Sequence, residues 1–93
     1  MIWSVYIIRC ANNSLYCGIT NDVNRRFSEH QAMGKKTAKA LRGKGPLELI
    51  LHSAIGDRSE ALKREAWFKS LSKIEKENIV ETGVLPNTID ENA

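Results

Sequence analysis

Two short runs of strand-forming residues near the N-terminus, with a turn between them, constrain the fold of this chain most. Residues 3–9 read WSVYIIR and residues 15–19 read LYCGI, and both runs are rich in aromatic and β-branched residues. The intervening residues 11–14 read ANNS, which is turn chemistry because Asn tolerates a positive φ and Ser hydrogen-bonds locally to the backbone. We therefore expect a β-hairpin with a tyrosine on each arm, Tyr6 and Tyr16.

The length of the hairpin loop decides whether the two tyrosines lie on the same face of the sheet. A loop of two or four residues places them on opposite faces, whereas a loop of three or five residues places them on one face. From the hairpin alone we favour one tyrosine in the core and one on the surface. Side chains alternate along a strand, so the first strand should present Tyr6, Ile8 and Cys10 on one face and Val5, Ile7 and Arg9 on the other.

A helix should follow the hairpin. Residues 20–22 read TND, a cluster of helix-capping residues, and the helix that they open should run to about Ala32. Arg26 and His30 are four residues apart, so they stack one turn apart beside the apolar stripe of this helix. Two interpretations stay open. Both side chains serve a site, or Arg26 snorkels at the helix edge and His30 complements the negative end of the helix dipole.

The segment from Gly34 to Pro46 is basic and contains no acidic residue. Five cations within ten residues suit contact with phosphate groups, and a solvated lysine loop is the alternative. Residues 37–42 of this segment should form a helical turn. The candidate nucleic-acid-binding set comprises Arg25 on the preceding helix, which points away from Arg26, and Lys35, Lys36, Lys39, Arg42 and Lys44.

A third strand and two further helices complete the predicted elements. Residues 47–53 read LELILHS and alternate as a strand, with Leu47, Leu49 and Leu51 on one face. Asp57 with Glu60 has the spacing of a capping box and opens a helix that runs through Leu71. Ser72 with Glu75 opens a last helix over residues 73–82, closed by Gly83. The inward-facing residues should be Ala61, Leu62 and Phe68 on the first helix and Ile74, Ile79 and Val80 on the second.

Glu65 lies in the middle of the inner face expected for the first of these helices. A carboxylate is costly there unless it is paired or binds a cation. Two interpretations are open for Glu65: a metal or catalytic role, or an ion pair for which Arg26 is the obvious candidate.

The predicted order is β-β-α-(short α)-β-α-α, an α/β or α+β fold with a three-stranded, mostly antiparallel sheet flanked by helices. With 93 residues we expect one domain over residues 1–85 and a polar tail over residues 86–93. The net charge of +3 leans weakly toward an anionic partner. The two cysteines do not make a disulfide framework, which favours a reducing, cytoplasmic location. No apolar run is long enough to span a membrane.

The order and spacing of these motifs resemble the GIY-YIG nuclease superfamily, and most closely its small single-domain bacterial members, the YhbQ-like group. The resemblance runs from Trp3 to about Thr82. It is carried by the two strand tyrosines in Ser-Val-Tyr and Tyr-Cys-Gly, by the helical Arg and His, and by the later motifs KALRGKG (residues 39–45) and DRSEAL (residues 57–62).

The resemblance implies a catalytic role for Tyr6, Tyr16, Arg26 and His30 and a single divalent cation, Mg²⁺ or Mn²⁺, on Glu65. These residue types suit phosphodiester hydrolysis. A tyrosine acting as general base needs nearby cations, and we favour Tyr6 for this role. Arginine offers a permanent charge and a planar fork of donors for phosphate oxygens, and His30 would orient a tyrosine or relay a proton. The superfamily pattern also has a late asparagine, for which Asn78 and Asn87 are the candidates.

The implied substrate is DNA, with RNA as the alternative, and a membrane partner is not expected. Because the chain offers no recognition helix with obvious base-reading side chains, we expect structure- or end-dependent cleavage, in repair or recombination, or a protein partner that supplies specificity. Two other classes of function remain open. One is a non-catalytic nucleic-acid-binding module that uses residues 35–44, and the other is a protein-interaction domain that presents Trp67 on the helix after Asp57.

Overall fold

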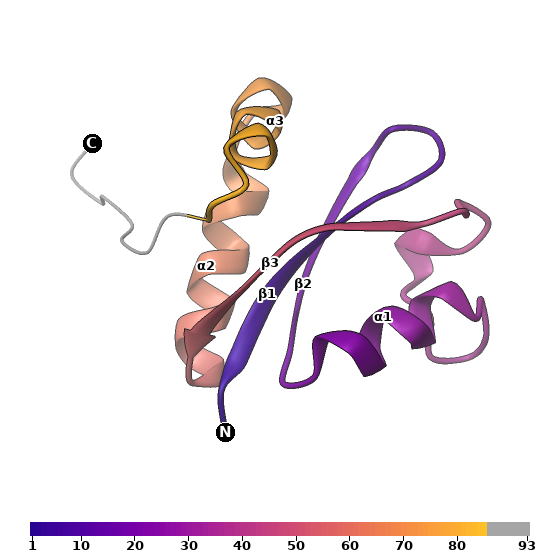
Figure 1. Cartoon of the computed structure of the whole chain (residues 1–93), viewed down its shortest axis with the longest axis horizontal. Coiled ribbons are helices and arrows are strands. Elements are labelled where there is room, and N and C mark those ends of the chain that lie inside the picture. Colours follow the sequence, from indigo (N-terminus) through magenta and orange to yellow (C-terminus); the bar gives the residue numbers. More distant parts are fainter. Residues whose placement is uncertain (86–93) are drawn as a thin grey trace.

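The predicted order of elements is present in the computed structural model, which describes residues 1–85 (Figure 1). The predicted tail and the candidate Asn87 lie outside the described residues. No helix within residues 1–85 is both long enough and apolar enough to cross a membrane. The elements are β1 (Trp3–Arg9), β2 (Leu15–Thr20), α1 (Val23–Gln31), the short 3-10 helix η1 (Lys39–Leu41), β3 (Glu48–Gly56), α2 (Arg58–Ser70) and α3 (Lys73–Thr82).

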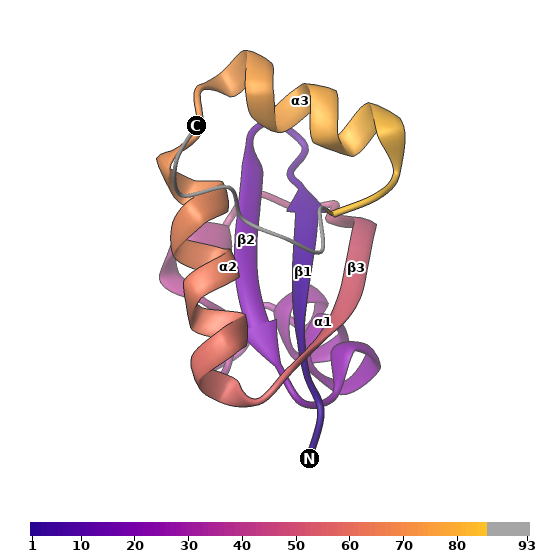
Figure 2. The same cartoon turned by 90° about the vertical axis from the view of Figure 1, so that its left-hand side faces the viewer.

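The three strands form one antiparallel sheet in the order β2-β1-β3, so the predicted fold class is confirmed. Helix α1 lies on one side of the sheet and α2 on the other (Figure 1), while α3 crosses the sheet at the end that carries the hairpin loop (Figure 2). Strand β1 lies between its two neighbours and is buried on both faces. Val5 and Ile7 pack toward α2 with Phe68, whereas Tyr6 and Ile8 pack toward α1 with Phe27.

The hairpin loop is five residues long. Arg9 pairs with Leu15, which leaves residues 10–14 to connect the strands. Asn13 takes a positive φ of 70°, and the side chain of Asn12 accepts hydrogen bonds from the Ser14 amide and hydroxyl. The odd loop length makes Ile8 pair with Tyr16, so both tyrosines lie on the α1 face of the sheet. The arrangement that we favoured from the hairpin alone, with the tyrosines on opposite faces, is therefore wrong.

Strand β3 contains an irregularity that its sequence does not signal. Ile8 pairs with Leu49 but Ile7 pairs with Leu51, so one extra residue is inserted in β3. Past the bulge the alternation of faces is reset, and Leu49 packs on the α1 side whereas Leu51 packs on the α2 side. The expectation that Leu47, Leu49 and Leu51 share a face is therefore wrong for Leu51.

Helices α2 and α3 begin and end at the predicted signals. Asp57 caps α2 by accepting a hydrogen bond from the Glu60 amide, Ser72 and Glu75 form a complete capping box, and Gly83 ends α3 with φ of 73°. Two predicted core contacts are wrong, because Leu62 is 38% exposed and Ile74 is 74% exposed. Helix α3 packs instead through Ile79 and Val80.

An ion pair fastens α3 to the hairpin. The guanidinium of Arg9 makes two hydrogen bonds to the Glu77 carboxylate, at 2.7 and 3.0 Å, and a third to Asn13 in the loop. Nζ of Lys73 lies 3.0 Å from Oε2 of Glu77, which also accepts from Arg9, and it donates to the Asn13 carbonyl as well. The contacts of Arg9 with Glu77 and of Lys73 with Asn13 join residues far apart in sequence, so they tie α3 to the hairpin loop.

Candidate active site

Three polar rings meet between β1, β2 and α1. The ring centroids lie 6.2 Å apart for Tyr6 and Tyr16, 5.8 Å for Tyr6 and His30, and 5.7 Å for Tyr16 and His30. The hydroxyl of Tyr6 is 2.8 Å from Nε2 of His30. We call these three residues the tyrosine cluster. The spacing of β1, the loop and α1 thus brings together three of the four residues that the sequence assigned to catalysis.

Gly18, which has no side chain, leaves room for the Tyr6 ring. It is the residue that pairs with Tyr6 across the hairpin. A Cβ at position 18 would lie 2.5 Å from the Tyr6 hydroxyl oxygen and 2.6 Å from the ring carbon that carries it. Real Cβ atoms do not approach other atoms so closely, so any residue other than glycine forces the phenol out of the cluster.

Arg26 is the fourth predicted catalytic residue, and its charge acts on the tyrosine cluster. Its Nη1 donates to Glu29 at 3.1 Å and to the carbonyl of Lys36 at 2.6 Å. The guanidinium is close enough to Tyr6 and His30 to influence the pKa of both groups. Its side chain stays partly exposed, so a permanent cation borders the cluster where an anion from solvent can reach it.

Burial is the largest cause of the pKa shifts of Tyr6 and His30. Desolvation, with a smaller contribution from Tyr16, raises the pKa of Tyr6 well above its ordinary value, and the Arg26 charge only partly opposes this. Burial and then the Arg26 charge lower the pKa of His30 to about 4. At neutral pH, Tyr6 is therefore a neutral phenol and His30 a neutral imidazole.

Glu65 lies apart from the tyrosine cluster. Its carboxylate is 3.6 Å from Nζ of Lys69, so the ion pair left open for Glu65 is made with a lysine and not with the candidate Arg26, which pairs with Glu29. Glu65 is close to Cys17, whose thiol has its pKa raised to about 12 by burial and then by the Glu65 charge. Because Cys17 and Tyr16 are adjacent in β2, their side chains point to opposite faces. Glu65 therefore lies over the α2 face, beside the strand that carries Tyr16.

The donor set limits what kind of metal the protein can hold. Within residues 1–85 there is no group of three or more His, Cys, Asp or Glu side chains that could cage an ion. Glu65, the predicted ligand, contributes a single partly buried carboxylate. Mg²⁺ is commonly bound in this way, by one or two carboxylates with water and substrate phosphates completing the shell. The residues present fit a water-rich magnesium site and do not fit an all-protein cage.

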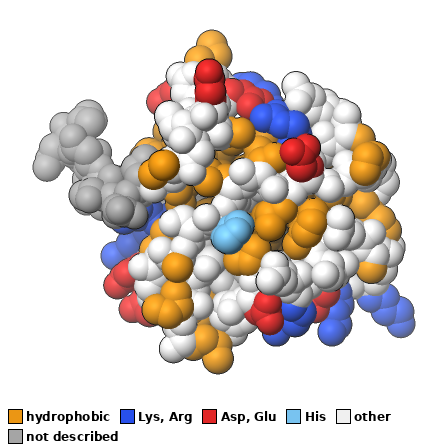
Figure 3. Space-filling model, in the orientation of Figure 1, with side chains coloured by type: hydrophobic (Ala, Val, Ile, Leu, Met, Phe, Trp, Pro, Cys, Tyr) orange, Lys and Arg blue, Asp and Glu red, His pale blue; other side chains and the backbone are white. Residues whose placement is uncertain are grey.

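The predicted nucleic-acid-binding residues lie beside the cluster but are not all free. Glu29 is 3.9 Å from Arg25 and 3.7 Å from Lys36, so this carboxylate offsets part of the local positive charge. Arg42 donates to the carbonyl of Lys35 at 3.4 Å. Lysine and arginine side chains gather below α1 in the space-filling view (Figure 3). Of the predicted set, Lys44 is partly buried and the others are exposed, namely Arg25, Lys35, Lys36, Lys39 and Arg42.

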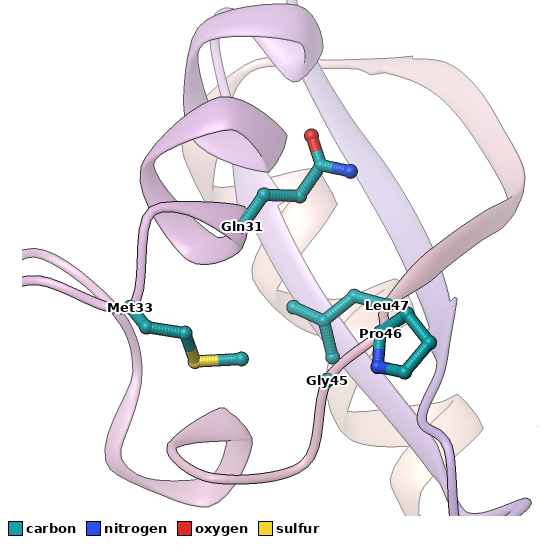
Figure 4. A pocket seen from close by; sticks show the side chains of 5 residues that line it. All are labelled: Gln31, Met33, Gly45, Pro46 and Leu47. Atoms are coloured by element: carbon teal, nitrogen blue, oxygen red, sulfur yellow. The ribbon is translucent and has the colours of Figure 1, made fainter.

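A pocket of about 240 Å³ lies where the loop after α1 meets the start of β3 (Figure 4). Its lining is mainly apolar, and the side chains of Gln31 and Met33 face Pro46 and Leu47 across it. None of the predicted catalytic residues lines this pocket. The tyrosine cluster is thus a packed group of rings at the sheet surface, separate from the pocket.

Two residues that the sequence did not single out help to build the site. Glu29 binds Arg26 and holds its guanidinium; its spacing of three residues from Arg26 and four from Arg25 is an interaction spacing in helices, so it could have been found. Thr37 is buried beneath the end of α1, at 3% exposure. It lies in a glycine- and lysine-rich segment whose composition indicates a solvated loop, so no sequence signal marked it.

Known proteins resemble this chain in family profile, in sequence and in structure. The family profile described as the GIY-YIG catalytic domain matches residues 2–78. A UPF0213 protein of Vibrio cholerae serotype O1 is 58% identical over 79 residues, which cover 84% of this chain and 76% of the relative. A UPF0213 protein of Yersinia pestis is 54% identical over 79 residues, which cover 85% of this chain and 81% of the relative.

Solved structures show the same similarity. The solution NMR structure of a UPF0213 protein from Bacillus halodurans is 39% identical, with a TM-score of 0.58, over 88% of this chain and 85% of that chain. The solution NMR structure of a protein from E. faecalis is 30% identical, with a TM-score of 0.61, over 99% of this chain and 96% of that chain. Sequence and fold thus point to the same set of relatives.

Proposed function

This chain belongs to the GIY-YIG catalytic domain family, and we propose that it is a nuclease that hydrolyses phosphodiester bonds in DNA with one divalent cation. The observation that carries the proposal is the meeting of Tyr6, Tyr16 and His30 under the charge of Arg26. A buried group of ionisable rings beside a partly exposed guanidinium is costly for a fold that needs only a core. Its residue types supply the donors and the base that hydrolysis requires.

Arg26 binds the phosphate in this proposal. Glu29 and the Lys36 carbonyl both engage Nη1. The guanidinium also interacts with the Tyr6 hydroxyl, and its remaining donors would bind the non-bridging oxygens, where negative charge grows during hydrolysis. Glu29 also competes with the substrate, so a phosphate must be held by more than one cation, and the exposed residues Lys35, Lys39 and Arg42 are placed nearby in the chain.

Tyr16 is the tyrosine better placed to take the proton from the attacking water. Tyr6 is 2% exposed, its hydroxyl contacts His30, and burial raises its pKa. Tyr16 is partly exposed on the edge strand β2 and can reach solvent without a change in the sheet. From the sequence we favoured Tyr6 as the base; the burial of Tyr6 instead favours a supporting role for it.

Glu65 would hold the cation. Helix α2 packs closely on β2, which is one of the two edge strands of the sheet (Figure 2). A phosphodiester that lies along this edge meets Tyr16 from one face and Glu65 from the other. When bound there, the cation supplies charge that stabilises the leaving oxygen. The protein residues bind and orient the phosphate.

The substrate in this proposal is DNA whose shape, rather than its sequence, is recognised. A module of this size buries about 600–1,000 Å² on DNA, which is too little for long sequence-specific contacts. The basic surface supplies salt-dependent attraction to the backbone. Cleavage at branches, flaps or ends, in repair or recombination, follows from these limits, and a protein partner that delivers the substrate is compatible with them.

Cleavage of labelled single-stranded, duplex, flap and branched DNAs, and of matched RNAs, with Mg²⁺ or Mn²⁺ tests the proposal. We expect Arg26→Ala to lower kcat about 10²–10³-fold and Glu65→Gln to abolish the stimulation by metal, while both variants keep most of their DNA affinity. His52→Ala, at an exposed histidine of β3, is the matched control and should cleave as the wild type does. Wild-type protein that binds DNA and cuts none of these substrates would contradict the proposal.

One observation favours a second function, a nucleic-acid-binding module without turnover. Glu65 already has a cationic partner in Lys69 and has no hydrogen bond or ion pair with the tyrosine cluster in the described part of the chain. This reading predicts binding that weakens with salt and is unaffected by Glu65→Gln. A protein-interaction role for an exposed Trp67 has less support, since Trp67 is partly buried against the α2-side core.

A further inference from the structure

We propose that the backbone amide of Ala38 fixes His30 as the tautomer that carries its proton on Nε2, and that Thr37 is the positioning residue that holds this amide in place. The inference concerns the tautomer in the free protein, and its consequence for catalysis rests on the proposed nuclease function. It follows from five contacts made by His30, Thr37 and Ala38, none of which involves a substrate.

The first contact assigns the roles of the two ring nitrogens. The amide nitrogen of Ala38 lies 3.3 Å from Nδ1 of His30. A backbone N–H can only donate, so Nδ1 must be the unprotonated, accepting nitrogen. In a neutral imidazole the proton is then on Nε2. Nε2 is 2.8 Å from the Tyr6 hydroxyl oxygen, and His30 therefore donates to Tyr6.

Thr37 holds the Ala38 amide against the ring. Its hydroxyl lies 2.9 Å from the carbonyl of Glu29 and 3.3 Å from that of His30, two carbonyls in the last turn of α1, and the His30 carbonyl also accepts from the Met33 amide. Its own amide donates to the Gly34 carbonyl at 3.1 Å. These bonds tie the chain at residue 37 to the last turn of α1, and the next amide in sequence points at His30.

The surroundings of His30 keep the ring neutral, and only a neutral imidazole carries its proton on one nitrogen and not the other. The charged and titratable groups that act on it are Tyr6 from β1, Tyr16 from β2, and Arg26 and Glu29 from α1 itself. His30 is fully buried, and burial and the positive charge of Arg26 outweigh the carboxylate of Glu29. A second proton on Nδ1 would also break the bond from Ala38.

This tautomer restricts the part that His30 plays in the reaction. Because Nε2 carries a proton, it cannot accept one from Tyr6, and a relay through this nitrogen is closed. The Tyr6 oxygen instead accepts from His30 and keeps its own hydrogen for donation elsewhere, where Tyr16 is the neighbouring ring. His30 thus orients the phenol, and its own orientation is set by the chain at residues 37 and 38.

Nitrogen-15 NMR of the imidazole rings in the ligand-free protein tests the inference independently of activity. His30 should show one tautomer, with a protonated Nε2, an accepting Nδ1 and a slowly exchanging ring N–H. His52, the other histidine of the chain, is exposed and should show averaging between tautomers, so it serves as an internal reference. A protonated Nδ1, or averaging at His30 like that of His52, would overturn the tautomer assignment.

Two substitutions test the role of Thr37. Thr37→Val keeps the shape of the side chain and removes the hydroxyl, and His30 should then show tautomer averaging and a faster exchange of its ring N–H. Thr37→Ser keeps the hydroxyl and should restore the wild-type spectrum. A folded Thr37→Val protein with the wild-type His30 spectrum would refute the positioning role. If the tautomer is as proposed and no DNA is cleaved, the inference stands and only the proposed function fails.

Discussion

The two faces of the sheet are built from the same strands but bury different chemistry. The α2 face is filled with apolar side chains, such as Val5, Ile7 and Phe68. The α1 face buries phenol, imidazole and hydroxyl groups as well, and His30 is fully shielded from solvent there. Successive residues of β1 point to opposite faces of the sheet. A single central strand thus serves a core that stabilises the fold and a site that carries the chemistry.

The difference predicts that substitutions on the two faces change stability and activity to different extents. The α2 face depends on the amount of apolar surface that it buries, which tolerates small changes of shape. The α1 face depends on hydrogen bonds whose direction matters, and each buried polar group there must keep its partner. Substitutions on the two faces should therefore fail in different ways.

The largest expected effect on stability is at the centre of the α2 face. Phe68 is 1% exposed, and Phe68→Ala should lower the free energy of unfolding by about 3–5 kcal/mol because it leaves a cavity. The tyrosine cluster lies on the other face and should keep its arrangement, so any loss of activity per folded molecule should come through Glu65, which lies on the same helix as Phe68. Urea denaturation followed by circular dichroism measures the first quantity. Ile74→Ala, at an exposed apolar position of α3, is the control and should be close to neutral.

A smaller change of stability with a large change of activity is expected on the α1 face. Gly18→Ala places a Cβ against the Tyr6 hydroxyl and should lower the free energy of unfolding by about 1–3 kcal/mol. It should also displace Tyr6 from His30 and abolish most of the cleavage. Gly34→Ala is the matched control, because no atom lies within 4 Å of the Cβ that it adds. Wild-type cleavage by Gly18→Ala would mean that Tyr6 does not need its observed position.

The smallest expected effect is a dependence of stability on pH that belongs to the α1 face. The pKa of His30 falls from 6.5 to about 4 on folding, because burial and Arg26 disfavour the charged ring. The unfolded chain then binds more protons, so this contribution is complete above pH 6.5 and is lost as the pH falls toward 4. In His30→Gln this part of the dependence should disappear, whereas in His52→Gln it should persist. Thermal unfolding at several pH values measures it.

Much of the fold was predictable because its signals are local. The caps at Asp57, Ser72 and Gly83 fixed the limits of α2 and α3, since each satisfies backbone groups within one helical turn. The bulge in β3 was not predictable, because it depends on how Leu49 and Leu51 meet a strand far away in the sequence. The exposure of Ile74 likewise depends on where α3 lies, and the long-range pair of Arg9 and Glu77 helps to set that position.

The residues of the candidate site were predictable from the sequence, whereas their arrangement in space was not. The family resemblance, confirmed over residues 2–78, named Tyr6, Tyr16 and His30. Their convergence required an odd loop, and the turn-like residues 11–14 suggested an even one because Cys10 reads as part of the strand. The separation of Glu65 from the cluster depends on which face α2 covers. The role of Thr37 could not be read from sequence, since its partners are carbonyl groups that every residue has.

The five-residue hairpin loop has a consequence for how such chains can diverge. If one residue were removed between Arg9 and Leu15 and the loop kept its five-residue form, the pairing would slip by one residue, and the thiol of Cys17 would take the place of the Tyr16 phenol beside His30. A change of two residues would leave the faces as they are. A slip of the register therefore removes Tyr16 from the tyrosine cluster, and the turn that holds the present register depends on Asn12, which accepts from Ser14, and on Asn13, whose φ is 70°.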